Sequence, residues 1–368
     1  MESQLSVYRR ENGRLSLYRR GSANRFGTLF GILLLLVKGE KEAAHKLFEQ
    51  NTRWLMSGLE IYEKEIGKGE LAEKRYSQYL SFMISVGWSV GDGLDELGII
   101  SERALHRIDL NKVIDRAVEG TVGYGNKAMF IAQYALLMKR MGSNKGKEVL
   151  DMWLERHLEK QNRIGLWGNT RTPYKMVQNG YHQVEILDYL GLGNEAQKDL
   201  AAKYVWSYQG RDLLWTPYPG GSPCYDYDAI YFLLRKTDLT DQETGMLKSV
   251  LQKVESMRRS YGGFCENSFL GKSKRAKRFG GLLGGFYPYY WPSGVKEKSR
   301  WLTLVRGKFD NNILYRHWDS EVFDWDEENL WAGFFRELAI ERLRSRLLKT
   351  DERVKISGPG LGSAGQRL

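Results

Sequence analysis

The sequence is poor in cysteine, histidine and proline. Its 368 residues include 2 Cys, 5 His and 7 Pro. The two cysteines, Cys224 and Cys265, are too few for a disulfide framework or a four-cysteine zinc site. The chain therefore does not belong to the small disulfide-rich or zinc-ribbon classes, and its cysteine usage fits a reducing compartment.

Long apolar runs are also missing. The stretch FGTLFGILLLLV, from Phe26 to Val37, has 12 residues, whereas a helix needs about 20 to cross a bilayer. We expect it to be a buried core helix, with an interfacial helix as the alternative. The first 25 residues contain YRR twice and no long apolar core, so no signal peptide is expected. We predict a cytoplasmic protein, with peripheral membrane contact left open.

Positive charge and aromatic residues are abundant. The formal net charge is +11, and the chain holds 11 Trp and 21 Tyr. An excess of positive charge favours an anionic partner such as a phosphate, an acidic glycan or a membrane surface. Tyr and Trp line clefts for sugars and hydrocarbons as well as cores. Nucleic-acid binding would rest on charge alone and is not expected, and the oligomeric state is left open.

A hidden repeat organises the chain. The tripeptides GLW at Gly165, LLW at Leu213 and GGF at Gly262 stand 48 and 49 residues apart. Each follows an amphipathic helix and precedes a loop and then a more apolar helix. The apolar helices are expected to start near Asn24, Tyr76, Asn126, Tyr174, Cys224 and Glu327. The sequence therefore predicts about six helical hairpins, each pairing an apolar with an amphipathic helix.

The repeat predicts an all-α fold, specifically an (α/α)6 toroid. An open solenoid needs polar caps at its ends, but the first apolar helix is among the most hydrophobic segments, and ring closure would bury it. An open α-solenoid is the alternative. We expect residues 1–23 to form an N-terminal segment with a short hairpin at Asn12-Gly13. Residues 24–350 would form a single toroid domain with an irregular insertion at 269–323, and residues 351–368 a disordered tail.

The repeated turns resemble those of known toroids. QNRIGLWG, from Gln161 to Gly168, resembles the QW repeat of triterpene cyclases, and SYQGRDLLW looks like a degenerate copy. RRSYGGFCEN resembles the GGF turns of protein prenyltransferase β subunits. The resemblance covers about residues 120 to 268 and implies the toroid fold that these families share. Glycoside hydrolases, polysaccharide lyases and sugar epimerases use the same fold, so the fold alone does not select a chemistry.

The candidate site residues come from the first turns of the expected inner helices, which converge at one end of a toroid. The candidates for catalysis are Tyr181, His182, Asp226, Asp228, Asp326 and Glu328. The candidates for substrate binding are Arg25, Asn126, Lys127, Asn179, Glu185, Tyr225, Asn329 and Trp331.

Three of these candidates carry alternatives. Either Asp226 or Asp228 suits a helix N-cap, because an acidic first turn accepts backbone N–H groups. Asp228 abuts the apolar run and is the better candidate for a general acid or base whose pKa is raised by burial. His182 is a core histidine or a catalytic base, and its spacing places Glu185 on the same helix face.

Two weaker patterns concern acid and metal chemistry. DWDE, around Asp326, resembles the DxDD acid motif of class II terpene cyclases, with Glu327 in place of the last Asp. Protein prenyltransferases hold zinc with Asp, Cys and His. Cys224, Asp226 and His182 have those side-chain types but not that order or spacing. We predict no cofactor and no metal site, and zinc remains a minor alternative.

Three functions stay open. The first is an enzyme acting on an anionic poly- or oligosaccharide by acid/base chemistry, as a lyase, hydrolase or epimerase. In a hydrolase, Asp228 and Glu328 would form the acid/base pair, and in a lyase or epimerase His182 or Tyr181 would take the proton. The second is a cyclase or prenyltransferase-like enzyme on an isoprenoid diphosphate or polyene. The third is a non-catalytic toroid that binds a glycan or lipid.

Overall fold

The computed structural model describes residues 5–168, 173–216, 220–267, 318, 325–351 and 353–362. These residues form twelve α-helices and one short 3-10 turn, with no strand longer than an isolated bridge. The expected all-helical class is confirmed. The predicted insertion at 269–323, with its aromatic and basic stretches, lies outside the described residues except for Trp318.

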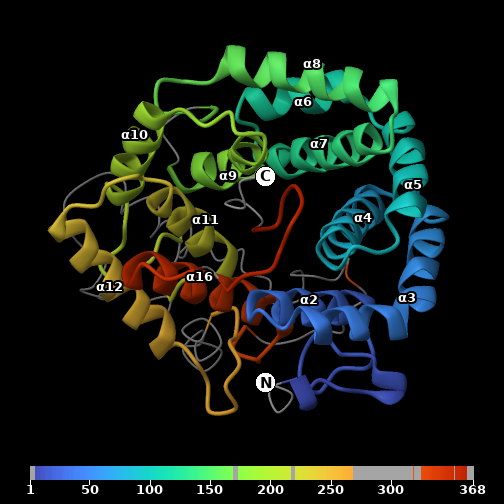
Figure 1. The fold of residues 1–368 in the computed structure, drawn as a ribbon, viewed down its shortest axis with the longest axis horizontal. Helices are drawn as coiled ribbons and strands as arrows, with labels where there is room; N and C mark the ends of the chain where they lie inside the picture. Colours follow the sequence, from blue (N-terminus) through green and yellow to red (C-terminus); the bar gives the residue numbers. More distant parts are fainter. Residues whose placement is uncertain are drawn as a thin grey trace, which may run out of the picture. The chain divides into compact units, whose positions relative to one another are not determined.

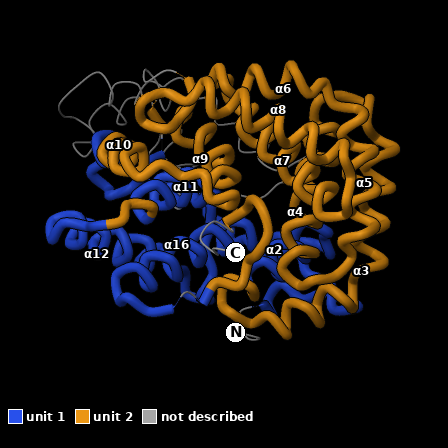
Figure 2. The backbone as a smooth tube through the Cα atoms, turned by 45° about the horizontal axis from the view of Figure 1, so that its top comes forward, with its two compact units in different colours: residues 1–34, 205–234, 238–353 blue, residues 35–204, 235–237, 354–368 orange. Residues whose placement is uncertain are grey.

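The chain divides into two compact units, where the sequence predicted one domain (Figure 2). Unit 1 contains residues 1–34, 205–234 and 238–353. Unit 2 contains residues 35–204, 235–237 and 354–368. Two helices, α2 (Arg25–Val37) and α10 (Glu195–Trp206), contribute residues to both units.

Unit 2 consists mainly of successive helices that pack on their chain neighbours (Figure 1). They are α3 (Lys41–Glu63), α4 (Glu70–Val90), α5 (Leu94–His106), α6 (Leu110–Val118), α7 (Tyr124–Arg140), α8 (Asn144–Lys160) and α9 (Pro173–Tyr189). Helix α7 packs against α8, α9, α5 and α6. It is buried from Ala128 to Met138, whereas α8 buries only one side. This contrast matches the expected pairing of an apolar with an amphipathic helix.

Unit 1 is built around the last helix of the chain. Helix α16 (Leu330–Leu348) packs against α11 (Pro223–Leu234) and α12 (Asp241–Ser256). A short extended segment precedes it and pairs with the residues that follow the third repeated turn. The N–H of Asn329 donates to Phe264 O (3.0 Å), and that of Asn267 donates to Trp325 O (2.8 Å). These bonds bring the starts of α11 and α16 into one region of unit 1.

The N-terminal segment forms the small turn that Asn12-Gly13 predicts. The 3-10 turn η1 (Glu11–Gly13) has positive φ at both residues, and an antiparallel bridge joins Arg9 to Leu15. The segment then lies against α2 at Gly27, where an added Cβ would come within 2.4 Å of the Leu17 nitrogen. Glycine at this position lets backbone approach backbone.

The three repeated turns share a backbone hydrogen-bond pattern, and the first two also share their side-chain bonds. In the first, Gln161 Nε2 donates to Gly165 O (3.1 Å) and Trp167 Nε1 donates to His157 O (2.9 Å). In the second, Gln209 Nε2 donates to Leu213 O (3.1 Å), and the indole of Trp215 makes the equivalent bond to Val205 O (3.0 Å). The pattern of side chains found in the sequence therefore corresponds to one local structure.

The third turn replaces the glutamine with an arginine. Arg258 Nη1 donates to Gly262 O at 2.9 Å, four residues on, as the glutamines do. It also forms an ion pair with the buried carboxylate of Glu337 in α16. The third turn is therefore linked to a second helix as well as to itself.

The C-terminal segment differs from the expected disordered tail. Val354, Ile356 and Leu361 are at most 4% exposed, and Gly358 to Gly362 are buried. The segment runs among α4, α7 and α9 of unit 2 (Figure 1). Its glycine, proline and serine content suggested disorder, but the small residues instead let an extended backbone fit between helices.

Candidate functional site

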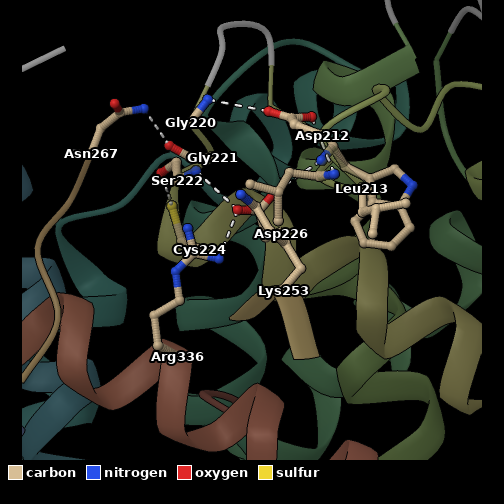
Figure 3. Close-up of polar contacts among 12 residues, drawn as sticks. Asp212, Leu213, Gly220, Gly221, Ser222, Cys224, Asp226, Lys253, Asn267 and Arg336 are labelled. Atoms are coloured by element: carbon tan, nitrogen blue, oxygen red, sulfur yellow. Dashed lines mark hydrogen bonds and ion pairs between the residues drawn. The ribbon is translucent and has the colours of Figure 1, made fainter. Parts of the chain in front are cut away.

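Asp226 holds the loop that precedes α11 (Figure 3). Its Oδ1 accepts the N–H of Trp215 (2.9 Å), and its Oδ2 accepts the N–H of Ser222 (3.0 Å). Gly221 has a φ of +79°, and a Cβ there would lie 2.6 Å from Asp226 Oδ2. The carboxylate thus fastens the second repeated turn to the helix start. Asp226 lies within α11 and accepts N–H groups that precede the helix, whereas the N-cap suggested by the sequence would accept those of its first turn.

A buried arginine adds an ion pair to these contacts of Asp226. Arg336 Nη1 of α16 lies 2.8 Å from Asp226 Oδ2, and both side chains are at most 1% exposed. Burial raises the pKa of Asp226, while Arg336 and the N–H of Trp215 act to lower it. Because both oxygens of Asp226 have partners, this residue is suited to holding structure rather than to moving protons.

A second group of polar side chains lies at the start of α11. Ser222 Oγ donates to Glu266 Oε1 (2.7 Å) and lies 3.7 Å from Cys224 Sγ. Burial, followed by the negative charges of Glu266 and Asp228, raises the pKa of the Cys224 thiol well above its ordinary value. Asp228 and Glu266 are 1% and 2% exposed. We call Ser222, Cys224, Asp228 and Glu266 the carboxylate cluster.

Glu328 lies in a different environment from the carboxylate cluster. Burial raises the pKa of Glu328, and the charges of Arg19 and Arg259 act to lower it. Burial and the charge of Glu328 in turn raise the pKa of Tyr8. An antiparallel bridge joins Glu328 to Cys265, and the acid/base pair of Asp228 and Glu328 stays a prediction.

The other candidates of unit 1 come from the starts of α16, α2 and α11, and most of them make contacts that stabilise the fold. Asn329 is the N-cap of α16, because its Oδ1 accepts the N–H of Ala332 (2.8 Å). Trp331 packs edge-on against Trp318 and Phe335, with ring centroids 4.9 and 4.4 Å apart. The backbone oxygen of Asp326 accepts a bond from Arg259. Arg25 and Tyr225 are partly exposed.

Unit 2 contains the remaining candidates, and Tyr181 and Glu185 form a pair there. Tyr181 Oη donates to Glu185 Oε1 (3.0 Å), and neither side chain is exposed. His182 is 8% exposed, its Nδ1 has no partner among the described residues, and burial lowers its pKa to about 3. The imidazole is therefore neutral at pH 7. The sequence placed Glu185 beside His182, but the hydrogen bond to it comes from Tyr181.

Asn179 joins three helices of unit 2. Its Oδ1 accepts the N–H of Gly125 at the start of α7 (2.6 Å), and its Nδ2 donates to Ala117 O in α6 (3.2 Å). Lys127 lies over the ring of Tyr124 (4.8 Å to the centroid), and Asn126 is partly exposed. The contacts of Asn179 are those of a helix-packing residue rather than of a free substrate ligand.

Two polar residues of interest were absent from the sequence prediction. Glu266 follows the third repeated turn, in GGFCEN, and no signal in the neighbouring sequence indicated it. Gln133 lies in the middle of α7, is fully buried, and bonds to Ser81 and Ser85 of α4. A glutamine inside an apolar helix could have indicated a buried polar contact, because a buried amide needs hydrogen-bond partners.

Searches for metal sites, membrane spans and similar proteins gave no match. Among the described residues, no group of three His, Cys, Asp or Glu side chains could hold a metal ion. In the same part of the chain, no helix combines the length and apolar character needed to cross a bilayer. Comparison with protein-family models, with curated proteins and with solved structures found nothing that matches the chain.

Proposed function

We propose that the chain is an (α/α) toroid enzyme that acts on an anionic poly- or oligosaccharide by acid/base chemistry. The toroid arrangement is supported by the equal spacing of three turns with one hydrogen-bond pattern. The anionic substrate is supported by the net charge of +11. A high-resolution experimental structure in which the six hairpins fail to close would refute the toroid.

The observation that carries the chemistry is the carboxylate cluster. Asp228 and Glu266 are almost fully buried, Ser222 donates to Glu266, and the charges of both carboxylates raise the pKa of the neighbouring Cys224 thiol. Burying two carboxylates near one another costs several kcal/mol in a typical protein interior. Such arrangements concentrate at functional sites, where one group gives a proton and the other takes it.

The cluster favours hydrolysis within this class of enzymes. Glycoside hydrolysis uses two carboxyl groups, one as acid and the other as base or nucleophile. We assign these roles to Asp228 and Glu266, with Ser222 as the positioning residue that donates to Glu266. Cys224 stays a protonated thiol because of its raised pKa and takes no nucleophilic role.

Turnover of uronate-containing glycans by the purified chain tests this proposal. We expect Asp228→Asn and Glu266→Gln each to lower kcat by about a hundredfold or more, because each removes one member of the acid/base pair. The matched control is Glu337→Gln, which changes a buried carboxylate that pairs with Arg258. Glu337→Gln should lower the unfolding temperature and leave kcat near the original value. Undiminished turnover in Asp228→Asn and Glu266→Gln would refute the assignment.

A further inference from the structure

The C-terminal segment Ser357–Gly362 fills a polar crevice of unit 2. Gln133 Nε2 donates to Pro359 O (2.6 Å), and Gly362 N–H donates to Glu185 Oε1. At its start, Ser357 N–H donates to Ser89 Oγ (3.0 Å). These three contacts use the backbone of the segment, and Ser357 Oγ also donates to Trp88 O (3.2 Å). The crevice therefore holds the segment mainly through its peptide backbone.

Alternate glycines set the fit of the segment. Gly358, Gly360 and Gly362 have φ values of +88°, +84° and +86°. A Cβ on Gly358 would lie 2.4 Å from Trp88 Cγ, and one on Gly360 would lie 2.4 Å from Gln133 Nε2. Only glycine satisfies both the backbone conformation and these close approaches.

The lining of the crevice is polar although it lies in a helical interior. Gln133 and Glu185 are fully buried in α7 and α9. Ser81 Oγ donates to Gln133 Oε1 (2.5 Å), and Gln133 Nε2 also reaches Ser85 Oγ (3.3 Å). Loss of the segment would remove one partner from Gln133 and one from Glu185, while their bonds to Ser81 and Tyr181 would remain. Such a lining suits an occupant that forms hydrogen bonds and can be exchanged.

We propose that this crevice is a binding site for a glycine-rich peptide that adopts positive φ at alternate glycines, and that Ser357–Gly362 is its resident, exchangeable occupant. Release of the segment would expose Glu185, Gln133 and the face of Trp88 to a second peptide of the same pattern. The site is separate from the carboxylate cluster and does not depend on the proposed chemistry.

Peptide binding to a shortened chain tests the proposal. The variant ends at Arg353, and the probe is a synthetic peptide of residues 354–362. Calorimetry measures the binding of the peptide to the variant. We expect saturable one-to-one binding, and binding to the intact chain weaker by about tenfold or more. The weakening arises because a tethered segment competes at an effective concentration of the order of millimolar. A matched peptide with Gly358 and Gly360 both replaced by alanine should not bind. The proposal would be overturned if the shortened chain is helical but does not bind the peptide of natural sequence, or if it binds the natural and the alanine-substituted peptides equally.

A full-length variant covers the case in which the shortened chain does not fold. Gly360→Ala places a methyl group against Gln133, whereas its control Gly142→Ala has a φ of +84° with nothing within 4 Å. Both carry the same backbone strain, but only Gly360→Ala should release the segment. Hydrogen exchange should then rise in residues 354–362 while α4, α7 and α9 stay protected, and the probe peptide should now bind. Exchange that rises equally in those three helices would show a fixed core segment and overturn the proposal.

Discussion

The two units fix an apolar helix with different kinds of polar side chain, a neutral amide in unit 2 and a charged pair in unit 1. We call these contacts the neutral clasp and the charged clasp. In unit 2, the neutral Asn179 joins α9 to α6 and α7 through backbone bonds. In unit 1, the charged Asp226 joins α11 to the second repeated turn and to Arg336. A neutral amide can lose a partner at modest cost, whereas a buried charge left alone is expensive. The comparison teaches that polar residues in corresponding helices of a repeat can differ greatly in the free energy lost when one partner is removed.

Breaking the charged clasp should have the largest effect. We expect Arg336→Met to lower the free energy of unfolding by about 3–5 kcal/mol, because it leaves the Asp226 carboxylate buried without its countercharge. Denaturant unfolding would measure it. The double variant Asp226→Asn with Arg336→Met should recover part of this loss, since an amide oxygen still accepts one backbone N–H. A double variant no more stable than Arg336→Met would contradict the charge-based explanation.

Two buried histidines should make stability depend on pH. Burial lowers the pKa of His157 and His182 from 6.5 to about 3. Below pH 6.5 the unfolded chain therefore binds more protons than the folded one, so stability falls as the pH falls. From pH 6.5 to 5, each histidine should cost about 2 kcal/mol of unfolding free energy. Unfolding curves at both pH values would measure this, and His182→Gln should remove about half of the effect. An unchanged slope would contradict a neutral buried His182.

Breaking the neutral clasp should cost less than breaking the charged one. We expect Asn179→Ala to lower the unfolding free energy by about 2 kcal/mol, because the N–H of Gly125 and the carbonyl of Ala117 lose their partner. Thermal unfolding of this variant beside Arg336→Met tests the comparison directly. A loss in Asn179→Ala equal to that in Arg336→Met would remove the distinction between the two clasps.

The repeated turns should show the smallest effects. Gln161→Ala and Gln209→Ala each delete one partly buried side-chain bond, so each should lower the unfolding free energy by about 1 kcal/mol. The two values should agree, because the two turns share one geometry although they lie in different units. Denaturant midpoints would test this. If the two unfolding free energies differ by several kcal/mol, the packing around the two turns contributes unequally to stability although their hydrogen bonds match.

The sequence predicted local structure better than it predicted partners. The bonds within the repeated turns join residues four or ten positions apart, so short-range chemistry sufficed to indicate them. The bonds of Asp226 reach further, and the sequence offered that residue only as a helix N-cap or a catalytic acid. Arg336 is 110 positions beyond Asp226, and nothing local identifies it as the partner. Glu266 was missed for the same reason, since its bond to Ser222 arises from chain folding. The C-terminal segment was judged by composition, which ignores the fit that alternate glycines allow.

The candidate site was predicted only as separate pieces. The starts of the apolar helices supplied Asp228, Tyr181 and Glu185, and each of them is buried with polar neighbours. Which of them share a neighbourhood depends on contacts between distant segments, such as the bond from Ser222 to Glu266. Residue type and position on a helix therefore identified candidates, while tertiary packing chose the pairs.

The contacts of the N-terminal segment have a consequence for biosynthesis. Asn24 Nδ2 donates to Trp318 O across 294 positions of sequence, and Leu330 N–H donates to Leu17 O. A ribosome releases the first residues long before these partners exist, so they stay unpaired for most of translation. Most of unit 2 lies between residues 35 and 204 and can form before the C-terminal segment joins it. Unit 1 needs α16, so the apolar residues from Phe26 to Leu34 lack their native partners until late in synthesis.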